Sequence, residues 1–317
     1  MEIAPFETEH FVARSDFNTP WQLCNSDCET VTIAELLALA GDSLEQFGRE
    51  RLAYTESQGD RGLRELIASA HEGIEADDAV VLGTPVEGIY LAARAALEPG
   101  DEVVVLAPAY DALINLFEHV VGKDCVRRWR IRPAADSWEL NLDELQALLT
   151  PRTRMLVVNF PHNPTGYLPS PEFQQRLVAL AEQHGLWLFY DEMYFGLTHS
   201  GTPPIPSAAG LSERCIVLSG LSKTHGLPGL RCGWLIVRDE ALRNSIMNWK
   251  FYTSICPPVA TEYLARAALK ARELLRSMNI ARIERNLQHA DAFFARWPQR
   301  FAWRRPLAGT TALVGFA

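Results

Sequence analysis

Long apolar runs are missing from this sequence, and so is an excess of basic residues. The longest apolar runs fall far short of the ~18 residues that a membrane-spanning helix requires, so we expect no contact with a membrane. Lys and Arg number 30 against 39 Asp and Glu, which gives a formal net charge of −9. A chain this acidic is a poor general binder of nucleic acid or of an anionic surface.

Targeting and metal-binding signals are absent as well. The N-terminus carries Glu2, Glu7 and Glu9 in place of an apolar segment, so we expect no signal peptide. The six cysteines include no CxxC pair and are typical of free thiols in a cytoplasmic protein. Cys24 and Cys28 have no histidine cluster nearby, and we predict no metal site. No GxGxxG motif follows an apolar run, which disfavours a dinucleotide-binding domain.

The sequence does contain short apolar runs that alternate with longer amphipathic stretches. The runs are rich in Val and Leu and are not interrupted by polar residues, which is typical of strands buried on both faces of a mostly parallel sheet. We therefore predict an α/β fold with helices on both sides of the sheet. The predicted strands are Val80–Leu82, Glu102–Leu106, Met155–Val158, Leu186–Tyr190, Cys215–Leu218 and Gly233–Val237. The predicted helices between them are Glu87–Leu97, Leu113–Val121, Leu142–Leu149 and Pro171–His184.

The pattern changes after Glu240. Two long helices are predicted over Glu262–Leu275 and Asn279–Trp297, followed by a strand over Phe301–Ala317. Because the chain stops within this apolar strand and no return strand follows to pair with it, we expect the C-terminal domain to be truncated. The predicted organisation is an N-terminal arm that forms part of a small α+β domain (1–45), a large domain (46–240) and the C-terminal part of the small domain (241–317).

Chemically capable side chains follow the predicted strands at the point where each strand ends. In an open α/β sheet ligands bind beyond the carboxyl ends of the strands, so we expect these side chains to share one edge. Together they supply an acid, an amide, two phenols, a lysine and an arginine, which suits a phosphorylated aromatic cofactor. They are Tyr110, Asn163, Asp191, Tyr194, Lys223 and Arg231, and Thr84, Pro85 and Val86 open the helix after the first strand.

The residues around the lysine resemble a known family. The run from Gly220 to Gly233, GLSKTHGLPGLRCG, is similar to the cofactor-attachment region of class I/II aminotransferases, which are fold-type I pyridoxal-phosphate enzymes. Asn163–Gly166 and Asp191–Tyr194 match the next two landmarks of that family, in the same order. With a tyrosine segment that begins at Tyr54, the resemblance covers nearly the whole chain. It implies a seven-stranded, mostly parallel sheet, a smaller α+β domain and pyridoxal 5'-phosphate as the cofactor.

The resemblance assigns roles to four of these side chains. Lys223 would form a Schiff base with the cofactor aldehyde and would later carry the proton of the substrate Cα. Asp191 would pair with the pyridine nitrogen and keep it protonated, so that the ring accepts electrons. Tyr194 and Asn163 would hydrogen-bond the ring oxygen.

Three more residues are expected around the cofactor. Arg231 would grip the phosphate with its planar guanidinium, and Tyr110 would stack on the ring. Tyr54 resembles the residue that reaches across a dimer interface to the phosphate of the neighbouring subunit. The implied protein is therefore a homodimer with shared active sites.

The expected phosphate cradle departs from the usual family pattern. Thr84, Pro85 and Val86 stand where relatives usually have Gly-Ala-Ser/Thr, and Gly220 stands where many have serine. Proline has no N–H to donate and valine has no hydroxyl. We expect the helix amides near Val86, together with Thr84, Ser222 and the arginine, to hold the phosphate with lowered affinity.

Two other parts of the sequence allow two interpretations each. By resemblance to the N-terminal arm of such enzymes, Trp21 and Asn25-Ser26-Asp27 either line the substrate pocket or serve packing. The four arginines between residues 127 and 132, with Trp129 among them, form either an anion-binding patch or the solvated edge of a strand. We favour the strand edge.

The leading hypothesis is a pyridoxal-phosphate-dependent aminotransferase that acts on an amino acid and a 2-oxo acid. The same lysine, aspartate and tyrosine also serve lyases and oxidases or cyclases that use this cofactor. Residues 159–164 resemble capreomycidine-synthase-like proteins as well, so a reaction of that kind is the alternative. A third hypothesis, a catalytically idle binding protein with the same fold, rests on the altered cradle and on the early end of the chain.

Overall fold

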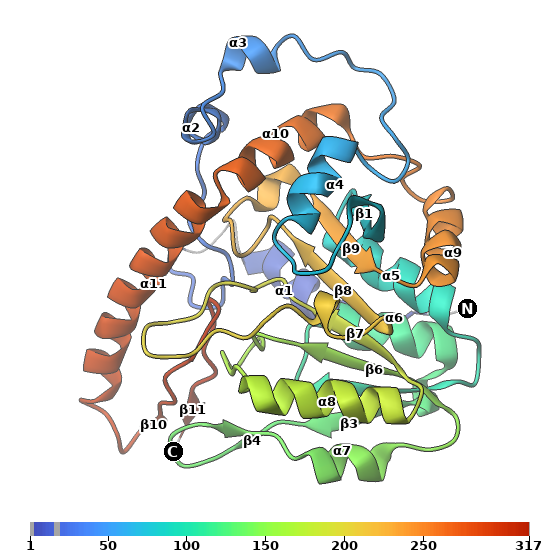
Figure 1. Cartoon of the computed structure of the whole chain (residues 1–317). Coiled ribbons are helices and arrows are strands. Elements are labelled where there is room, and N and C mark those ends of the chain that lie inside the picture. Colours follow the sequence, from blue (N-terminus) through green and yellow to red (C-terminus); the bar gives the residue numbers. More distant parts are fainter. Residues whose placement is uncertain (1–2, 16–19, 317) are drawn as a thin grey trace.

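The computed structural model describes residues 3–15 and 20–316, and it is an α/β structure built around one large sheet (Figure 1). Its α-helices are α1 (Glu7–Ser15), α2 (Ile33–Leu39), α3 (Leu44–Phe47), α4 (Arg61–Ala68), α5 (Pro85–Ala96), α6 (Ala112–Val121), α7 (Leu142–Leu148), α8 (Pro171–Gln183), α9 (Glu240–Lys250), α10 (Val259–Lys270) and α11 (Arg272–Phe294). Its strands are β1 (Ala79–Leu82), β2 (Glu102–Ala107), β3 (Val126–Arg130), β4 (Arg132–Pro133), β5 (Trp138–Glu139), β6 (Thr153–Asn159), β7 (Trp187–Asp191), β8 (Cys215–Gly220), β9 (Gly233–Val237), β10 (Phe301–Ala302) and β11 (Gly315–Phe316).

The central sheet has seven strands in the order β1-β9-β8-β7-β6-β2-β3. Strands β8, β7, β6, β2 and β3 are parallel to one another, whereas β9 is antiparallel to both of its neighbours. The predicted α/β fold with a mostly parallel sheet is therefore confirmed. Because β6, β7 and β8 run in the same direction, their last residues, Asn159, Asp191 and Gly220, lie at one edge of the sheet.

Helices cover both faces of this sheet. Successive strand residues point to opposite faces, and they enter two separate buried clusters. Val81 and Val158 belong to a cluster with residues of α4, α7, α8 and α10, while Val80 and Val157 belong to one with residues of α5, α6 and α9. Burial on both faces explains why the strands contain unbroken apolar runs.

Helix α8 begins at Pro171 as predicted, whereas α5 begins at Pro85, before the predicted Glu87. Ser170 caps α8 by accepting a hydrogen bond from the Phe173 N–H, and Pro171 occupies the first helical position. Pro85 occupies the corresponding position in α5, directly after Thr84. Both helices therefore begin at a proline, although only α8 has a side-chain cap, and the N-terminus of α5 belongs to the candidate site.

The predicted bounds of the two long helices are wrong. The helices expected over Glu262–Leu275 and Asn279–Trp297 are α10 and α11, which meet at Ala271. Ala271 is buried and carries no proline or glycine signal, so the break follows from packing. Among the helices of the described residues, none combines the length and the apolar composition that crossing a bilayer requires.

The strand expected over Phe301–Ala317 is also wrong as a continuous element. Its described part contains only β10 and β11, which pair with each other. Between them Pro306 lacks an amide hydrogen and Gly309 takes a φ of +76°, so the chain turns away from an extended course. The turn packs on the large sheet's loops: the Leu307 N–H donates to Gly166 O (2.8 Å) and the Gly309 N–H to Leu197 O (2.8 Å).

Candidate active site

Lys223 lies in a tight turn that follows β8. The Leu221 N–H donates to Cys232 O (3.2 Å), and Leu221 O accepts from the Leu227 N–H (3.0 Å). One residue beyond the lysine, the Thr224 hydroxyl lies within hydrogen-bond distance of two backbone oxygens in the loop after β7. These contacts hold the backbone of Lys223 against that loop.

Asp191 and Tyr194 come from the end of β7, and Asn163 comes from the loop after β6. Asp191 is buried, and its Oδ1 accepts from the Met193 N–H (2.9 Å). The Tyr194 hydroxyl lies 3.4 Å from Asn163 Nδ2. An acid, a phenol and an amide therefore meet at the carboxyl edge of neighbouring strands.

Arg231 and Thr84 meet at the N-terminus of α5. The guanidinium donates to Thr84 Oγ1 (2.7 Å) and to Pro228 O (2.9 Å). Arg231 has a φ of +48°, a left-handed conformation that non-glycine residues adopt rarely and often at functional sites. Val86 is partly exposed beside Thr84 on α5, and Ser222 is buried next to Lys223.

Pro85 packs directly on glycines of β8 and β9. A Cβ placed on Gly220 would lie 2.8 Å from Cys232 O and 3.0 Å from Pro85 Cγ, and a Cβ on Gly233 would lie 2.8 Å from Pro85 N. A serine at position 220 therefore has no room beside this proline. The two departures from the usual phosphate-cradle pattern, Pro85 and Gly220, therefore fit together: the glycine leaves the room that the proline ring occupies.

Tyr110 and Tyr54 have very different surroundings. The Tyr110 hydroxyl donates to a Glu9 carboxylate oxygen (2.6 Å), and its ring lies 5.1 Å from that of Phe6. Burial, and after it the Glu9 carboxylate, raises the pKa of Tyr110, so the phenol is neutral. Tyr54 is 89% exposed in the segment before α4.

The N-terminal segment reaches the lysine. Lys223 Nζ donates to Ser26 Oγ (2.7 Å) and forms an ion pair with the Asp27 carboxylate. The Thr310 hydroxyl in turn donates to Ser26 O (2.6 Å). Trp21 is 86% exposed, so packing in the core does not explain it.

Burial and nearby charge control the ionisation of the site. Burial raises the pKa of Asp191 to about 6, so a cation beside it would further stabilise its charged form. Burial also raises the pKa of Tyr194. For Lys223, burial lowers the pKa, but Tyr194 and Asp27 together outweigh it, and the pKa is raised.

Two supporting residues were not singled out from the sequence. Asn159 Nδ2 donates to Asp191 O (3.0 Å) and Asn159 Oδ1 accepts from the Asn163 N–H (2.8 Å). His162 Nε2 lies 2.9 Å from Pro108 O, and because a carbonyl only accepts, Nε2 carries the proton. Burial lowers the pKa of His162 to about 4, so the ring is neutral. Both residues lie at or just after the end of β6, and this position is the signal that could have revealed them.

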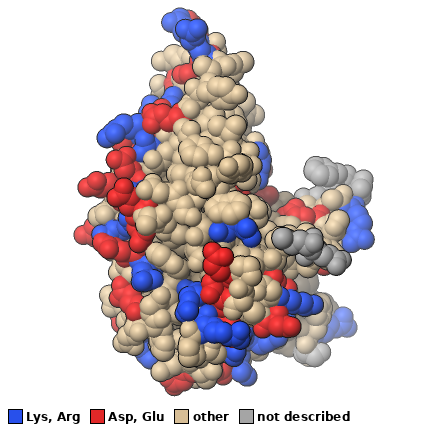
Figure 2. All heavy atoms as spheres, turned by 90° about the vertical axis from the view of Figure 1, so that its right-hand side faces the viewer, with Lys and Arg blue, Asp and Glu red and all other residues tan. Residues whose placement is uncertain are grey.

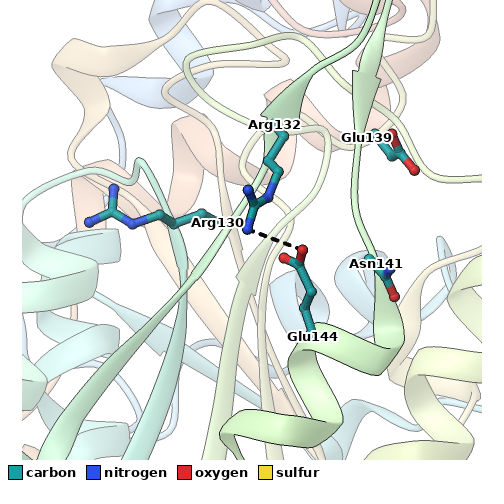
Figure 3. A pocket seen from close by; sticks show the side chains of 5 residues that line it. All are labelled: Arg130, Arg132, Glu139, Asn141 and Glu144. Atoms are coloured by element: carbon teal, nitrogen blue, oxygen red, sulfur yellow. Dashed lines mark ion pairs between the residues drawn. The ribbon is translucent and has the colours of Figure 1, made fainter.

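The basic run forms the edge strand β3 and its continuation, as favoured from the sequence. Figure 3 shows the pocket lined by Arg130, Arg132, Glu139, Asn141 and Glu144, in which Arg130 points away from the ion pair between Arg132 and Glu144. Acidic side chains also neutralise other arginines of the run, through Arg127–Glu102 and Arg128–Glu118 pairs. The described residues contain no cluster of His, Cys, Asp and Glu arranged to hold a metal ion.

The fold is that of the fold-type I pyridoxal-phosphate-dependent enzymes. Residues 22–304 match the class I and II aminotransferase family, and the chain belongs to this family. Capreomycidine synthase of Streptomyces vinaceus is 29% identical over 97% of this chain and 78% of its own length. The arginine–pyruvate transaminase of Pseudomonas aeruginosa is 31% identical, over 71% of this chain and 54% of its own length. The crystal structure of a PLP-dependent aminotransferase from Streptococcus suis has a TM-score of 0.92 and 25% identity, over 100% of this chain and 84% of that one.

Members of this family use pyridoxal 5'-phosphate, and the residues at the strand ends fit that group. Lys223 offers a primary amine for its carbonyl, and Asp191 is a buried acid whose charged form a cationic ring nitrogen would stabilise. Arg231 and Thr84 offer donors for a phosphate at a helix N-terminus. Tyr194 and Asn163 offer donors for an oxygen of the ring.

Proposed function

We propose that the protein is an aminotransferase that moves an amino group between an amino acid and a 2-oxo acid. The observation that carries the proposal is the contact of the Tyr194 hydroxyl with Asn163 (3.4 Å) beside the buried Asp191 at the end of β7, with Lys223 close enough for its charge to act on both Asp191 and Tyr194. In such a site pyridoxal 5'-phosphate supplies a reactive carbonyl and an electron sink. The protein supplies the binding, the orientation and the proton transfers.

Each site residue has a separate task in this proposal. Arg231 and Thr84 hold the phosphate, with help from Ser222 and from the first amides of α5. Asp191, as a carboxylate, would keep the ring nitrogen protonated, because a charged acid in a buried site is stabilised by a cation. The Tyr194 phenol and the Asn163 amide would donate hydrogen bonds to the ring oxygen and so orient the ring.

Lys223 is the residue that moves protons in this proposal. When its amine is free, Nζ accepts the proton from the Cα of the bound amino acid and returns it later. The amine must be neutral to accept this proton. The contacts that Nζ makes with Ser26 and Asp27 therefore bear directly on its reactivity.

A second candidate is a lyase or a cyclase that uses the same cofactor. The observation that favours it is the match to capreomycidine synthase, which extends over 97% of this chain, whereas the match to the transaminase extends over 71%. Both candidates need the same lysine, acid and phenol. They differ in which bond of the substrate breaks after the proton leaves Cα.

We propose that the protein works as a homodimer through the face that carries Tyr54. Large apolar side chains are exposed in two segments there, namely Leu52, Tyr54, Phe251, Tyr252 and Ile255. The Thr55 hydroxyl donates to Pro257 O (3.0 Å), which joins the two segments. Figure 2 shows the molecule from the side of α9, where uncharged surface occupies much of the upper half. An exposed apolar surface of this kind is typical of an interface.

The first experiment is a titration of the purified protein with pyridoxal 5'-phosphate. We expect a visible absorption band that Lys223→Ala lacks and that the exposed-lysine control Lys270→Ala retains. A wild-type protein without the band at any cofactor concentration would contradict a pyridoxal-phosphate function for this chain.

The second experiment separates the two candidate reactions. The loaded protein is mixed with a panel of amino acids, and the products are identified by mass spectrometry. Formation of the 2-oxo acid together with the pyridoxamine form of the cofactor supports the aminotransferase. Release of ammonia or water from the substrate without the pyridoxamine form supports the lyase or cyclase.

A further inference from the structure

The amine of Lys223 is held by a segment that lies far away in the sequence. Ser26 Oγ lies 2.7 Å from Nζ, and the Asp27 carboxylate forms an ion pair with it, across a separation of 196 positions. The lysine side chain is 25% exposed and that of Asp27 is 31% exposed. The pair is therefore shielded from water over most of its surface, where an ion pair is stronger than it is at an open surface.

Several contacts fix the segment Asn25–Glu29 in this position. The Asp27 N–H donates to Asn25 Oδ1 (2.9 Å), and the Ser26 carbonyl accepts from Thr310 (2.6 Å). Glu29 pairs with Arg282 of α11 (2.7 Å). The segment also touches the turn that carries the lysine, because a Cβ on Gly226 would lie 2.8 Å from Glu29 O. The fold therefore holds both the segment that carries Asp27 and the turn that carries the amine.

Charged and titratable groups from three parts of the chain act on Nζ: the N-terminal segment, helix α1 and the end of β7. They are Asp27 and Cys28 of the N-terminal segment, Glu9 of α1, and Asp191 and Tyr194 at the end of β7. Asp27 is the carboxylate in contact with Nζ. Glu9 acts through its charge, and its carboxylate accepts the hydrogen bond of Tyr110.

We propose that Asp27 is a positioning residue for Lys223: together with Ser26 it holds the amine at the edge of the sheet as an ammonium, and it sets the pH above which this amine reacts with carbonyl compounds. The inference rests on the proposed function, which gives the amine its role. It adds a residue that controls when the lysine becomes reactive.

The chemistry follows from the proton balance of the amine. An ammonium has no lone pair, so Nζ first passes one proton to solvent, and Asp27 opposes this step because it stabilises the charge. The neutral amine then forms a bond to the carbonyl carbon. The carbonyl oxygen leaves as water with the two remaining protons of Nζ, which leaves a C=N bond and changes no oxidation state.

The test measures the protonation of Lys223 without any cofactor. The full chain, freed of carbonyl compounds, is labelled with trace acetic anhydride over a pH series, and acetylation of Lys223 is compared by mass spectrometry with that of the exposed Lys123 and Lys270. We expect Asp27→Asn to move the midpoint of Lys223 labelling down by ~1 pH unit or more, because an opposite charge in contact shifts a pKa by that amount. Below the midpoint, labelling then becomes roughly tenfold faster.

The matched control is Glu29→Gln, which removes one charge from the same segment but from a residue that pairs with Arg282. We expect this variant to leave the midpoint close to that of the wild type. A shift in Asp27→Asn no larger than in Glu29→Gln would overturn the proposal. Asp27→Ser, which also lacks the charge, repeats the test if the asparagine variant folds poorly, and circular dichroism checks both folds.

A parallel titration with pyridoxal 5'-phosphate keeps this inference separate from the proposed function. If the wild type shows no visible band but the labelling midpoint shifts in Asp27→Asn, the proposed function fails and the role of Asp27 stands. If the band forms and its pH dependence is the same in both proteins, with no shift in labelling, the role of Asp27 fails and the proposed function stands.

Discussion

Two neighbouring acids at the end of β7 have opposite surroundings. The Asp191 carboxylate accepts a hydrogen bond from the Met193 N–H (2.9 Å) and interacts with Asn159 at the end of β6, and it is part of the candidate site. Glu192 points the other way and accepts hydrogen bonds from the Ser207 hydroxyl (2.8 Å) and the Ala208 N–H (2.7 Å). Because adjacent strand residues face opposite sides, the sequence Asp-Glu supplies one acid to the site and one to the interior.

At the residue scale, we predict that Glu192 makes the protein less stable as the pH rises. Burial raises the pKa of Glu192 to about 8, against 4.5 for a free carboxyl. Between these values the folded state keeps a proton that the unfolded state has lost, so the free energy of unfolding falls as the pH increases. The loss is about 1.4 kcal/mol per unit of pKa difference, and so a few kcal/mol in total.

The variant Glu192→Gln tests this prediction, because an amide cannot ionise and can still bond Ser207 and Ala208. Urea unfolding at pH 5, 6.5 and 8 should show a flatter pH dependence in the variant than in the wild type. Equal slopes in the two proteins would show that this carboxyl is not responsible.

At the scale of elements, the N-terminus of α5 depends on its contact with β8 and β9. Pro85 lies against Gly220 and Gly233, so the start of the helix comes close to the sheet. Thr84 directly before it contacts Arg231. The packing of a proline on two glycines therefore positions the donors that we assign to the phosphate.

We predict that Gly220→Ala loosens this contact. The new Cβ would meet a backbone oxygen at 2.8 Å and Pro85 at 3.0 Å, and overpacking of this kind costs ~1–3 kcal/mol. We expect a lower free energy of unfolding and weaker binding of pyridoxal 5'-phosphate in a spectroscopic titration.

The control is Gly229→Ala in the same region of the chain, where a Cβ would have nothing within 4 Å. This variant should unfold at nearly the same denaturant concentration as the wild type. If Gly220→Ala is equally neutral, the close approach of Pro85 does not constrain this position.

At the scale of the whole molecule, the exposed apolar side chains on the Tyr54 face predict self-association. We expect the wild type to sediment as a dimer at micromolar concentration. Leu52→Asp combined with Tyr252→Asp should shift it toward the monomer, since a charge placed in an apolar interface is costly. A wild type that remains monomeric at all concentrations would rule out this interface.

Much of the fold was predictable from the sequence, and the reasons are local. Strands such as Val80–Leu82 were visible because burial on both faces removes polar residues from them. The break between α10 and α11 at Ala271 could not be predicted, because no proline or glycine marks it. The turn at Gly309 was missed because the apolar residues around it are typical of a strand.

The candidate site also has a part that the sequence predicts and a part that it does not. The chain order of strands and motifs was enough to place Asp191, Asn163 and Lys223 at one edge, because parallel strands end on the same side of a sheet. Contacts between distant segments were not predictable. The resemblance offered Asn25-Ser26-Asp27 as pocket residues in one of two interpretations, but no local pattern indicates that Asp27 contacts Lys223 or that Glu9 contacts Tyr110.

The sequence by itself determined the class of the fold and the chemical groups available at the strand ends, because both depend on local patterns of burial and on the order of the elements. Only the tertiary structure decided which groups touch. It placed Ser26 and Asp27 on the amine of Lys223 and matched Pro85 to Gly220. These contacts depend on how segments far apart in the chain pack together. The scarcity of basic residues and of long apolar runs in the sequence gives no information about such packing.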